Sequence, residues 1–571
     1  MSNLRALLDA RVRAALAAAG APDAPALVAA SSRPEFGDYQ ANGCMAAAKQ
    51  LKRPPRDLAA AVVAHLPADA LIASVEIAGP GFINIRLQDG WLARTAAVDL
   101  ADPRSASDDS QRVVVDYSAP NLAKEMHVGH LRSTIIGDAV ARVLEHLGNT
   151  VIRQNHIGDW GTQFGMLITQ FTETGANSTE LSDLEAFYRT AAARFRDDPE
   201  FADRARAAVV KLQSGDDATR ERWQRFIDTS LSHCEAVYHL LGVGLAREHL
   251  RAESSYNDML QPVIDALRAQ GLLQESDGAL CVFLEEFKGK DGNPLPLIVQ
   301  KTGGGFLYAT TDLAAIRYRN DGLRADRVLY FVDARQALHF RQVFAAARLA
   351  GFARPELLLE HCSFGSMLGA DGKPFKSRSG DTVKLVELLE EAQRRAASLL
   401  AERGDLDEAA RADVARAVGI GAVKYADLSK HRTNDYIFDW EQMLSFEGNT
   451  APYLQYACTR IHSIFRRAGV APASIASGGR DRPLVAEERV LALQLARFAE
   501  TLDSVARESL PHYLCTYLYE LSGNFMKFYE HCPVLDGDAQ TRDGRLALCA
   551  TTLAVLTKGL ELLGIATVER M

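Results

Sequence analysis

Two histidines, His127 and His130, follow a strand-like segment and stand at the start of a helical pattern. A β-branched run at 113–115 stops at a proline-containing loop, so the order is strand, loop and helix N-terminus. Such a helix start presents backbone N–H groups and the positive end of a dipole, which together favour a phosphate group. Residues three apart on a helix leave from one face, and Gly129 between them lets a flat base approach closely. The segment is therefore a candidate nucleotide site, with two surface histidines at an ordinary helix start as the alternative.

A basic, glycine-flanked segment, KPFKSRSG at 373–380, is a second candidate for phosphate binding. Its lysines and hydroxyls would bring positive charge and hydrogen-bond donors to one loop. Taken alone, the same composition also describes an exposed cationic turn.

Tyr308 and Asp312 are four residues apart where a helix is expected to begin, so both side chains should face the same way. The alternative for Asp312 is a first-turn carboxylate that favours the helix dipole. His156 and Asp159 could hold a metal ion, but the sequence offers no third ligand nearby.

These segments resemble the signature motifs of one family, the arginyl-tRNA synthetases, which are class I aminoacyl-tRNA synthetases. The lead-in SAPNLAK at 118–124, followed by HVGH at 127–130, resembles the ATP-binding signature. Matches in order along a chain are far more specific than any one of them. The further matches are QNHIGDWGTQFG (154–165), LYATTDLA (307–314), VDARQALH (332–339), FKSRSGDTVKL (375–385) and SFEGNTAPYLQY (445–456).

The resemblance implies that ATP, with Mg²⁺, activates arginine to arginyl-adenylate, and that arginine then passes to the terminal ribose of tRNA(Arg). The nucleophile in the first step is a carboxylate, which is already ionised at neutral pH and needs no general base. Catalysis would come from aligning the carboxylate with the α-phosphorus and from stabilising charge on the phosphates. No zinc or other tightly bound cofactor is expected.

The phosphate-binding loop departs from the usual pattern of the class I enzymes. Ser377 takes the place of the second lysine, and Lys376 lies one residue early. The resemblance implies that Lys124 supplies the missing charge. The catalytic residues expected are Lys124, His127, His130 and Lys376, and ATP is expected to contact His127, Gly129, His130, Lys373, Lys376 and Ser377.

The resemblance also implies a pocket for the arginine side chain. A guanidinium needs a planar carboxylate partner, further acceptors and apolar walls, because burying it unpaired is costly. Asp312 is expected to pair with the guanidinium, while Tyr308 lines the pocket. Glu253 follows Ala252, where the family usually has glycine. The arginine-binding residues expected are Asn121, Glu253, Tyr308, Asp312 and Gln336.

Contacts with tRNA are expected at both ends of the chain. Phe36 could stack on an unpaired base of the tRNA elbow, and Gln40 could hydrogen-bond to its edge. Tyr453, Tyr456 and Met571 lie in segments that resemble the anticodon-binding domain of the family. For the two tyrosines, a place in the core of a helical bundle is the alternative.

Composition indicates an ordinary globular protein. Its 571 residues are too many for one core, and 47% hydrophobic and 24% charged residues are typical values. No stretch approaches the roughly 18 uninterrupted apolar residues of a membrane span, and the N-terminus is not a secretory signal. The eight cysteines have no metal-ligand spacing, which favours reduced thiols in the cytoplasm. A net charge of −9 disfavours nonspecific nucleic-acid binding, but a local basic face could still bind RNA.

We expect an α/β protein of three domains. A small N-terminal α/β domain at 1–105, the tRNA-elbow module, ends in a polar linker. A Rossmann-type doubly wound parallel-sheet catalytic domain with a helical and hairpin-like insertion at about 170–310 covers 106–385, and an all-α anticodon-binding bundle covers 386–571. The helices expected are at 3–20, 40–65 and 546–565. The strands expected are at 26–31, within 74–87 on either side of a turn at 79–81, and at 112–117, 150–155, 327–332 and 356–364.

Two rivals differ from this interpretation. One is another nucleotidyl transferase of the same fold, such as a cysteinyl- or pantothenate-activating enzyme; Tyr308, Asp312 and the lack of zinc-type cysteines disfavour it. The other is a catalytically silent RNA-binding paralogue, which the intact Lys124, histidine pair and Lys376 disfavour. The partners expected are tRNA(Arg), L-arginine and ATP, with no membrane, and the family expectation is a monomer.

Overall fold

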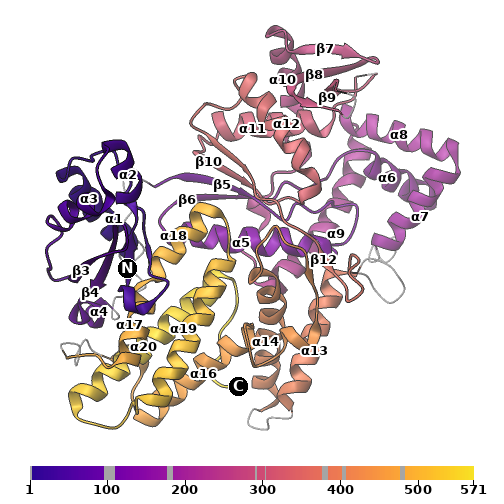
Figure 1. Ribbon diagram of the computed structural model, residues 1–571. Helices are drawn as coiled ribbons and strands as arrows, with labels where there is room; N and C mark the ends of the chain where they lie inside the picture. The colour runs from indigo at the N-terminus through magenta and orange to yellow at the C-terminus, as the bar shows by residue number, and fades with distance from the viewer. Residues whose placement is uncertain are drawn as a thin grey trace.

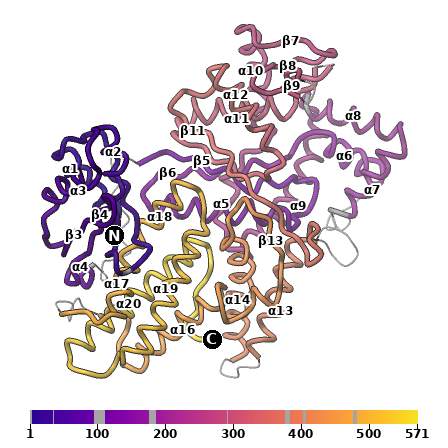
Figure 2. Tube along the Cα trace, in the orientation of Figure 1, coloured from indigo at the N-terminus to yellow at the C-terminus, as the bar shows by residue number. Residues whose placement is uncertain are grey.

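The structure is a computed structural model, which describes residues 3–95, 110–175, 184–289, 292–302, 304–375, 383–401, 407–475 and 482–571. These residues form a small N-terminal α/β domain, a central domain around a parallel sheet, and a C-terminal helical bundle (Figure 1). In Figures 1 and 2 the indigo N-terminal domain lies beside α17 (Ala486–Ala496) and α18 (Phe498–Glu508) of the bundle, so segments far apart in the sequence are neighbours.

The N-terminal domain packs helices α1, α2 and α3 against a four-stranded antiparallel sheet of order β1-β2-β4-β3. The expected single helix at 40–65 is wrong. Tyr39–Ala41 pairs with β4, and the helical part is divided because Lys52 is left-handed (φ 53°) and Pro55 starts a new helix. The elements are α1 (Leu4–Ala18), β1 (Val28–Ala30), β2 (Tyr39–Ala41), α2 (Gly43–Leu51), α3 (Pro55–Val63), β3 (Ile72–Ala78), β4 (Phe82–Leu87) and α4 (Asp89–Thr95).

Ion pairs and hydrogen bonds join this domain to the bundle. The guanidinium of Arg489, on α17 (Ala486–Ala496), lies 2.8 Å from Asp38 and 2.6 Å from Asp89. The hydroxyl of Tyr39 donates to Glu500 over 2.9 Å. Because Arg489, Asp38 and Tyr39 are largely shielded from water, their contacts fix the domain against the bundle more firmly than exposed pairs would.

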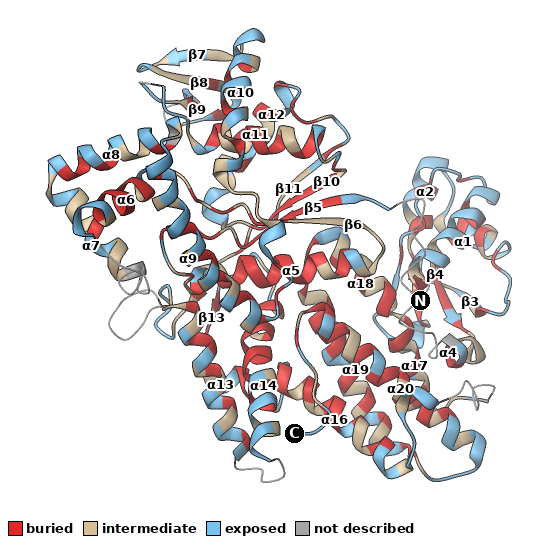
Figure 3. Cartoon of the chain, turned by 180° about the vertical axis from the view of Figure 1, so that it is seen from behind, coloured by how far each residue is buried: buried red, intermediate tan, exposed pale blue. Residues whose placement is uncertain are grey.

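The central sheet is parallel, with order β11-β10-β5-β6, as expected from the sequence. Its central residues, including Val113, Val114 and Val115, are fully buried, which is typical of a parallel sheet covered on both faces (Figure 3). The last strand is shorter than the expected 356–364, because the apolar residues after it are buried in a loop. The strands are β5 (Arg112–Asp116), β6 (Thr150–Gln154), β10 (Arg327–Tyr330) and β11 (Leu358–His361).

Helices cover the sheet, and the insertion between β6 and β10 contains both helices and a three-stranded antiparallel sheet. The sheet of the insertion lies at the outer end of the molecule in Figure 1. Besides the four strands of its parallel sheet, the central domain contains α5 (Leu131–His146), α6 (Thr162–Thr174), α7 (Leu184–Asp197), α8 (Pro199–Ser214), α9 (Asp217–Leu241), α10 (Asn257–Ala269), β7 (Leu273–Ser276), β8 (Ala279–Lys288), β9 (Pro294–Gln300), α11 (Tyr308–Asp321), α12 (Ala337–Leu349) and β12 (Met367–Leu368).

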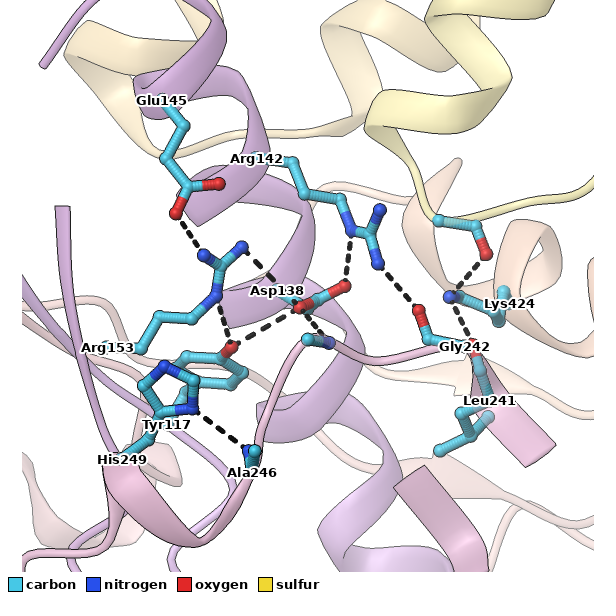
Figure 4. A network of polar contacts seen from close by, with 12 residues as sticks. Tyr117, Asp138, Arg142, Glu145, Arg153, Leu241, Gly242, Ala246, His249 and Lys424 are labelled. Carbon is cyan, nitrogen blue, oxygen red and sulfur yellow. Dashed lines mark hydrogen bonds and ion pairs between the residues drawn. The ribbon is translucent and has the colours of Figure 1, made fainter. Parts of the chain in front are cut away.

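Helix α5, which begins directly after the histidine pair, is buried along nearly its whole length. Near its start, Arg132 forms a buried ion pair with Asp427 over 2.9 Å. One and a half turns later, Asp138 accepts hydrogen bonds from Arg142 (2.7 Å) and from the backbone N–H of Gly244 (2.9 Å) (Figure 4). These contacts hold the helix against both the insertion and the bundle.

The described residues from 385 onward are helical apart from one short strand, as expected. The final helix begins before the predicted 546 and ends three residues before 565. None of the described helices is both long and apolar enough to cross a membrane. The elements are α13 (Leu385–Ala401), α14 (Glu408–Leu428), β13 (Tyr436–Ile437), α15 (Trp440–Met443), α16 (Ala451–Ala468), α17, α18 (Phe498–Glu508), α19 (His512–His531) and α20 (Ala539–Leu562).

Candidate active site

The carboxyl ends of β5, β6 and β10 meet at a cavity of about 1180 Å³. Ligands of open α/β sheets bind at this edge. The volume exceeds the roughly 300–1,000 Å³ of a pocket for one small ligand, so there is room for two substrates. Eight of the residues predicted to bind ATP or arginine line this cavity: Asn121, His127, Gly129, His130, Glu253, Tyr308, Asp312 and Gln336.

The histidine pair is held by the backbone of its own loop. Nδ1 of His127 accepts from the N–H of Gly129 over 3.0 Å, and Nδ1 of His130 accepts from the N–H of His127 over 3.1 Å. Because each Nδ1 accepts, the hydrogen of each neutral ring is on Nε2. A Cβ on Gly129 would lie 2.7 Å from the His127 ring, so this turn requires glycine.

Both histidines are neutral donors near pH 7. Burial lowers the pKa of His130 to about 3, and burial together with the charge of Lys124 lowers the pKa of His127. The ring centroids are 4.1 Å apart. The pair therefore offers two Nε2–H groups that can donate to phosphate oxygens.

The other part of the cavity is acidic. Burial, with the charges of Asp159 and Asp312 nearby, raises the pKa of Glu253 to about 8. Glu253 follows Ala252 and begins a short 3₁₀ turn, Glu253–Tyr256. The backbone N–H of Glu253 donates to the carbonyl of Ile157, which fixes the start of this turn. Tyr308 begins α11 and is 65% exposed, which leaves its ring accessible to a ligand.

Buried polar groups support the floor of the cavity. Arg319 donates to Asp116 and to Gln154, both over 2.7 Å, behind the strand ends. His156 also lines the cavity and is fully shielded, which lowers its pKa. Asp159 accepts from the N–H of Ser254 over 2.9 Å, which commits it to holding the turn that carries Glu253. Among the described residues no cluster of three or more metal-ligating side chains forms around His156 and Asp159.

The basic segment begins at the cavity wall. Lys373 is exposed in a tight turn, while Pro374 and Phe375 line the cavity. Lys376 and Ser377 lie outside the described residues. On the far flank, the carbonyl of Val383 accepts from the N–H of Val128 over 3.1 Å, so this flank is bonded to the histidine loop.

Lys124 is exposed, and its Nζ lies 4.7 Å from the ring centre of Tyr188. Neither Lys124 nor Lys373 is among the described residues that line the cavity.

The residues predicted to bind tRNA lie away from the cavity. Phe36 is 38% exposed, with the Arg33 guanidinium 5.9 Å from its ring. Gln40 lies on β2 and donates to Asn84 over 2.8 Å.

The predicted anticodon residues lie in the bundle. The ring of Tyr453 is 5.6 Å from that of Tyr519, and the Arg460 guanidinium is 5.2 Å from the ring of Tyr456. Met571 packs partly buried against the core. The tyrosines are half-buried and thus have both a packing role and an accessible edge.

The sequence did not single out several cavity residues. His339 was quoted only as the end of a motif, although it hydrogen-bonds to Asp312. The apolar wall comes from residues that follow β10 and β11. Their position after the carboxyl ends of predicted strands was the feature of the sequence that could have identified them. These wall residues are Phe331, Phe364, Met367 and Phe375.

Family comparisons agree with this geometry. The model for tRNA synthetases class I (R), catalytic domain, matches residues 96–440, the model for the arginyl tRNA synthetase N terminal domain matches 6–87, and the DALR anticodon binding domain matches 454–571. The fold and cavity, with these matches, define a class I aminoacyl-tRNA synthetase.

The chain is 56% identical to the arginine–tRNA ligase of Cellvibrio japonicus (strain Ueda107) and 55% identical to that of Chromobacterium violaceum, each over the full length of both chains. Among solved structures, arginyl-tRNA synthetase from Plasmodium falciparum matches with a TM-score of 0.85 and 28% identity, and that of Thermus thermophilus with 0.84 and 26%, again over both full chains. The chain belongs to the arginyl-tRNA synthetases.

Proposed function

We propose that the protein attaches L-arginine to tRNA(Arg) at the expense of ATP. The carboxylate of arginine attacks the α-phosphorus of ATP, the bond to the bridging oxygen of the β-phosphate breaks, and pyrophosphate leaves. The 2′-hydroxyl of the terminal ribose of the tRNA then attacks the carbonyl carbon of arginyl-adenylate. AMP leaves, and the hydroxyl proton passes to the departing phosphate or to water.

The observation that carries this proposal is that one cavity combines neutral donors with an acidic pocket. His127 and His130 line it with neutral donors suited to phosphate oxygens, and Asp312 with Glu253 lines it with acidic groups suited to a guanidinium. An activation reaction needs both ligands side by side, with the attacking carboxylate close to the α-phosphorus.

Each side chain then has a role. The Nε2–H groups of the histidines stabilise charge that develops on the phosphates. Lys124 and Lys376 share the charge of the departing pyrophosphate, and Lys373, Gly129 and Ser377 complete the ATP site. Asn121, Tyr308 and Gln336 complete the arginine site beside the two carboxylates. Mg²⁺ enters with ATP as the complexed substrate, because this ion prefers phosphate oxygens and water to a protein cage.

The outer domains bind the tRNA. Phe36 and Gln40, in the domain at 1–105, meet the tRNA elbow, and Tyr453, Tyr456 and Met571, in the bundle at 386–571, meet the anticodon arm. The catalytic domain is assigned to 106–385. The protein acts as a cytoplasmic monomer; all eight cysteines are buried free thiols, which supports a reducing compartment.

The test is radioactive arginine charging of purified tRNA(Arg) by the purified chain, together with ATP–pyrophosphate exchange. We expect charging of tRNA(Arg) but not of an unrelated tRNA, and exchange that requires arginine. Binding of tRNA without either reaction would favour the silent RNA-binding paralogue.

A further inference from the structure

The side chains of Asp312 and His339 form a hydrogen bond at the cavity wall. Oδ2 of Asp312 and Nε2 of His339 are 2.6 Å apart. Asp312 lies in the second turn of α11 and His339 in the first turn of α12, so the bond joins two helices that both reach the cavity. The two side chains are only 20% and 27% exposed, which shields the bond from competing water.

The direction of this bond follows from the two groups. An ionised carboxylate only accepts, so Nε2 of His339 carries the hydrogen. Among the described residues, no other hydrogen bond to the Asp312 carboxylate is present, so Oδ1 and a second lone pair of Oδ2 stay available to a ligand. His339 thus fixes the carboxylate through one atom and leaves the other to the substrate.

His339 is itself held in place. Its ring lies edge-on against Phe340, with centroids 5.6 Å apart at 77°. Phe340 is buried and stacks on His361 of β11, with centroids 4.9 Å apart at 27°. The donor to Asp312 is therefore anchored to the sheet, unlike a histidine on an open surface.

We propose that His339 is a positioning residue for amino-acid specificity, which orients the Asp312 carboxylate toward the substrate guanidinium. A guanidinium presents two parallel N–H groups and fits a carboxylate only in one plane, whereas an ammonium is a point donor that tolerates many orientations. A fixed carboxylate consequently favours arginine over lysine, and a rotating one loses that preference. The inference rests on the proposed role of Asp312 in arginine binding.

The test compares two substitutions of His339 with a neighbouring control. His339→Leu removes the donor, His339→Gln restores an N–H at similar reach, and Leu338→Ala changes an exposed side chain next to it on α12. The assay is ATP–pyrophosphate exchange with tRNA(Arg) present, at varied concentrations of arginine, lysine and ATP.

We expect His339→Leu to raise the KM for arginine by about 10- to 100-fold, which corresponds to one hydrogen bond to a charged group. The preference for arginine over lysine should fall, while kcat and the KM for ATP change little. His339→Gln should recover most of the loss, and Leu338→Ala should behave as wild type. Equal damage from Leu338→Ala, or no recovery with glutamine, would overturn the inference.

Asp312→Asn, alone and combined with His339→Leu, separates the role proposed for His339 from the role proposed for Asp312. If His339 acts through Asp312, adding His339→Leu to Asp312→Asn changes the arginine KM little further. If Asp312→Asn abolishes the preference for arginine while His339→Leu keeps the wild-type KM, the inference fails and the proposed function stands. If Asp312→Asn itself keeps the wild-type KM and preference, the proposed role of Asp312 fails. Should His339→Leu not fold, His339→Asn, whose donor is too short to reach, takes its place.

Discussion

Nζ of Lys424 lies 2.6 Å from the carbonyl oxygen of Gly564 and 2.7 Å from that of Leu241. Lys424 is on α14, Leu241 ends α9, and Gly564 follows α20, so one buried ammonium joins three parts of the molecule. Figure 4 shows this lysine beside the Asp138 network of α5, the helix that begins at the histidine pair. A Cβ on Gly564 would come within 2.5 Å of Nζ, and its φ of +66° also favours glycine.

Lys424→Met should loosen this junction. It removes the donor from the buried carbonyl of Leu241, which costs about 1–3 kcal/mol, and from the half-buried carbonyl of Gly564, which costs less. We expect a lower midpoint in urea denaturation and faster amide hydrogen exchange in the segment after α20. Lys430→Met, at an exposed lysine just after the end of α14, is the matched control and should change neither. Equal exchange rates in the two variants would mean that the ammonium is not what holds the segment.

Arginine binding should release a proton from Glu253. Its pKa is raised to about 8, so below this pH the carboxyl is protonated in the empty site, with Asp159, Asp312 and Tyr308 as its ionisable neighbours. A guanidinium favours the ionised form, so affinity should rise with pH by roughly tenfold per unit and level off above about pH 8. Calorimetry in buffers of different ionisation enthalpy measures the proton directly. Glu253→Gln should bind with little pH dependence; a wild-type protein that lacks pH dependence would exclude this role.

His130→Ala should slow adenylation by ~10²-fold or more, the usual effect of removing one preorganised donor to developing charge. Rate should suffer more than substrate affinity, because the interaction strengthens in the transition state. Single-turnover formation of arginyl-adenylate is the measurement, with circular dichroism as the check on folding. A near-normal rate would remove His130 from the catalytic residues.

Replacing Phe36 and Gln40 with alanine should raise the KM for tRNA and leave arginine and ATP unaffected. A stacked base is worth about 1–3 kcal/mol. Phe36→Ala should account for most of the effect, because the Gln40 amide already donates to Asn84. Leu27→Ala, at another exposed apolar position of the same domain, serves as the control. Unaltered tRNA kinetics would return Phe36 to the status of an ordinary surface residue.

Local patterns predicted the sheet and the histidine loop, because each depends on neighbours in sequence: Val113–Val115 form a buried run, and His130 is held by the backbone of His127. They did not reveal β2, whose three residues pair with Ile83–Ile85 far along the chain. The same limit hid the bond between Asp312 and His339, since a pairing across 27 residues depends on how two helices pack.

The most direct test of the account is tRNA-dependent ATP–pyrophosphate exchange with arginine, canavanine, citrulline and lysine, on wild type and on Asp312→Asn. A buried carboxylate that pairs with a guanidinium should reject citrulline and lysine by ~10⁴-fold or more, because each leaves a polar partner unsatisfied. Canavanine keeps the planar fork and should be the best of the three analogues. We predict that Asp312→Asn loses most of its arginine activation and that the remaining activity discriminates far less between arginine and citrulline. Wild-type discrimination that survives in Asp312→Asn would contradict the account, because the guanidinium would then be recognised elsewhere.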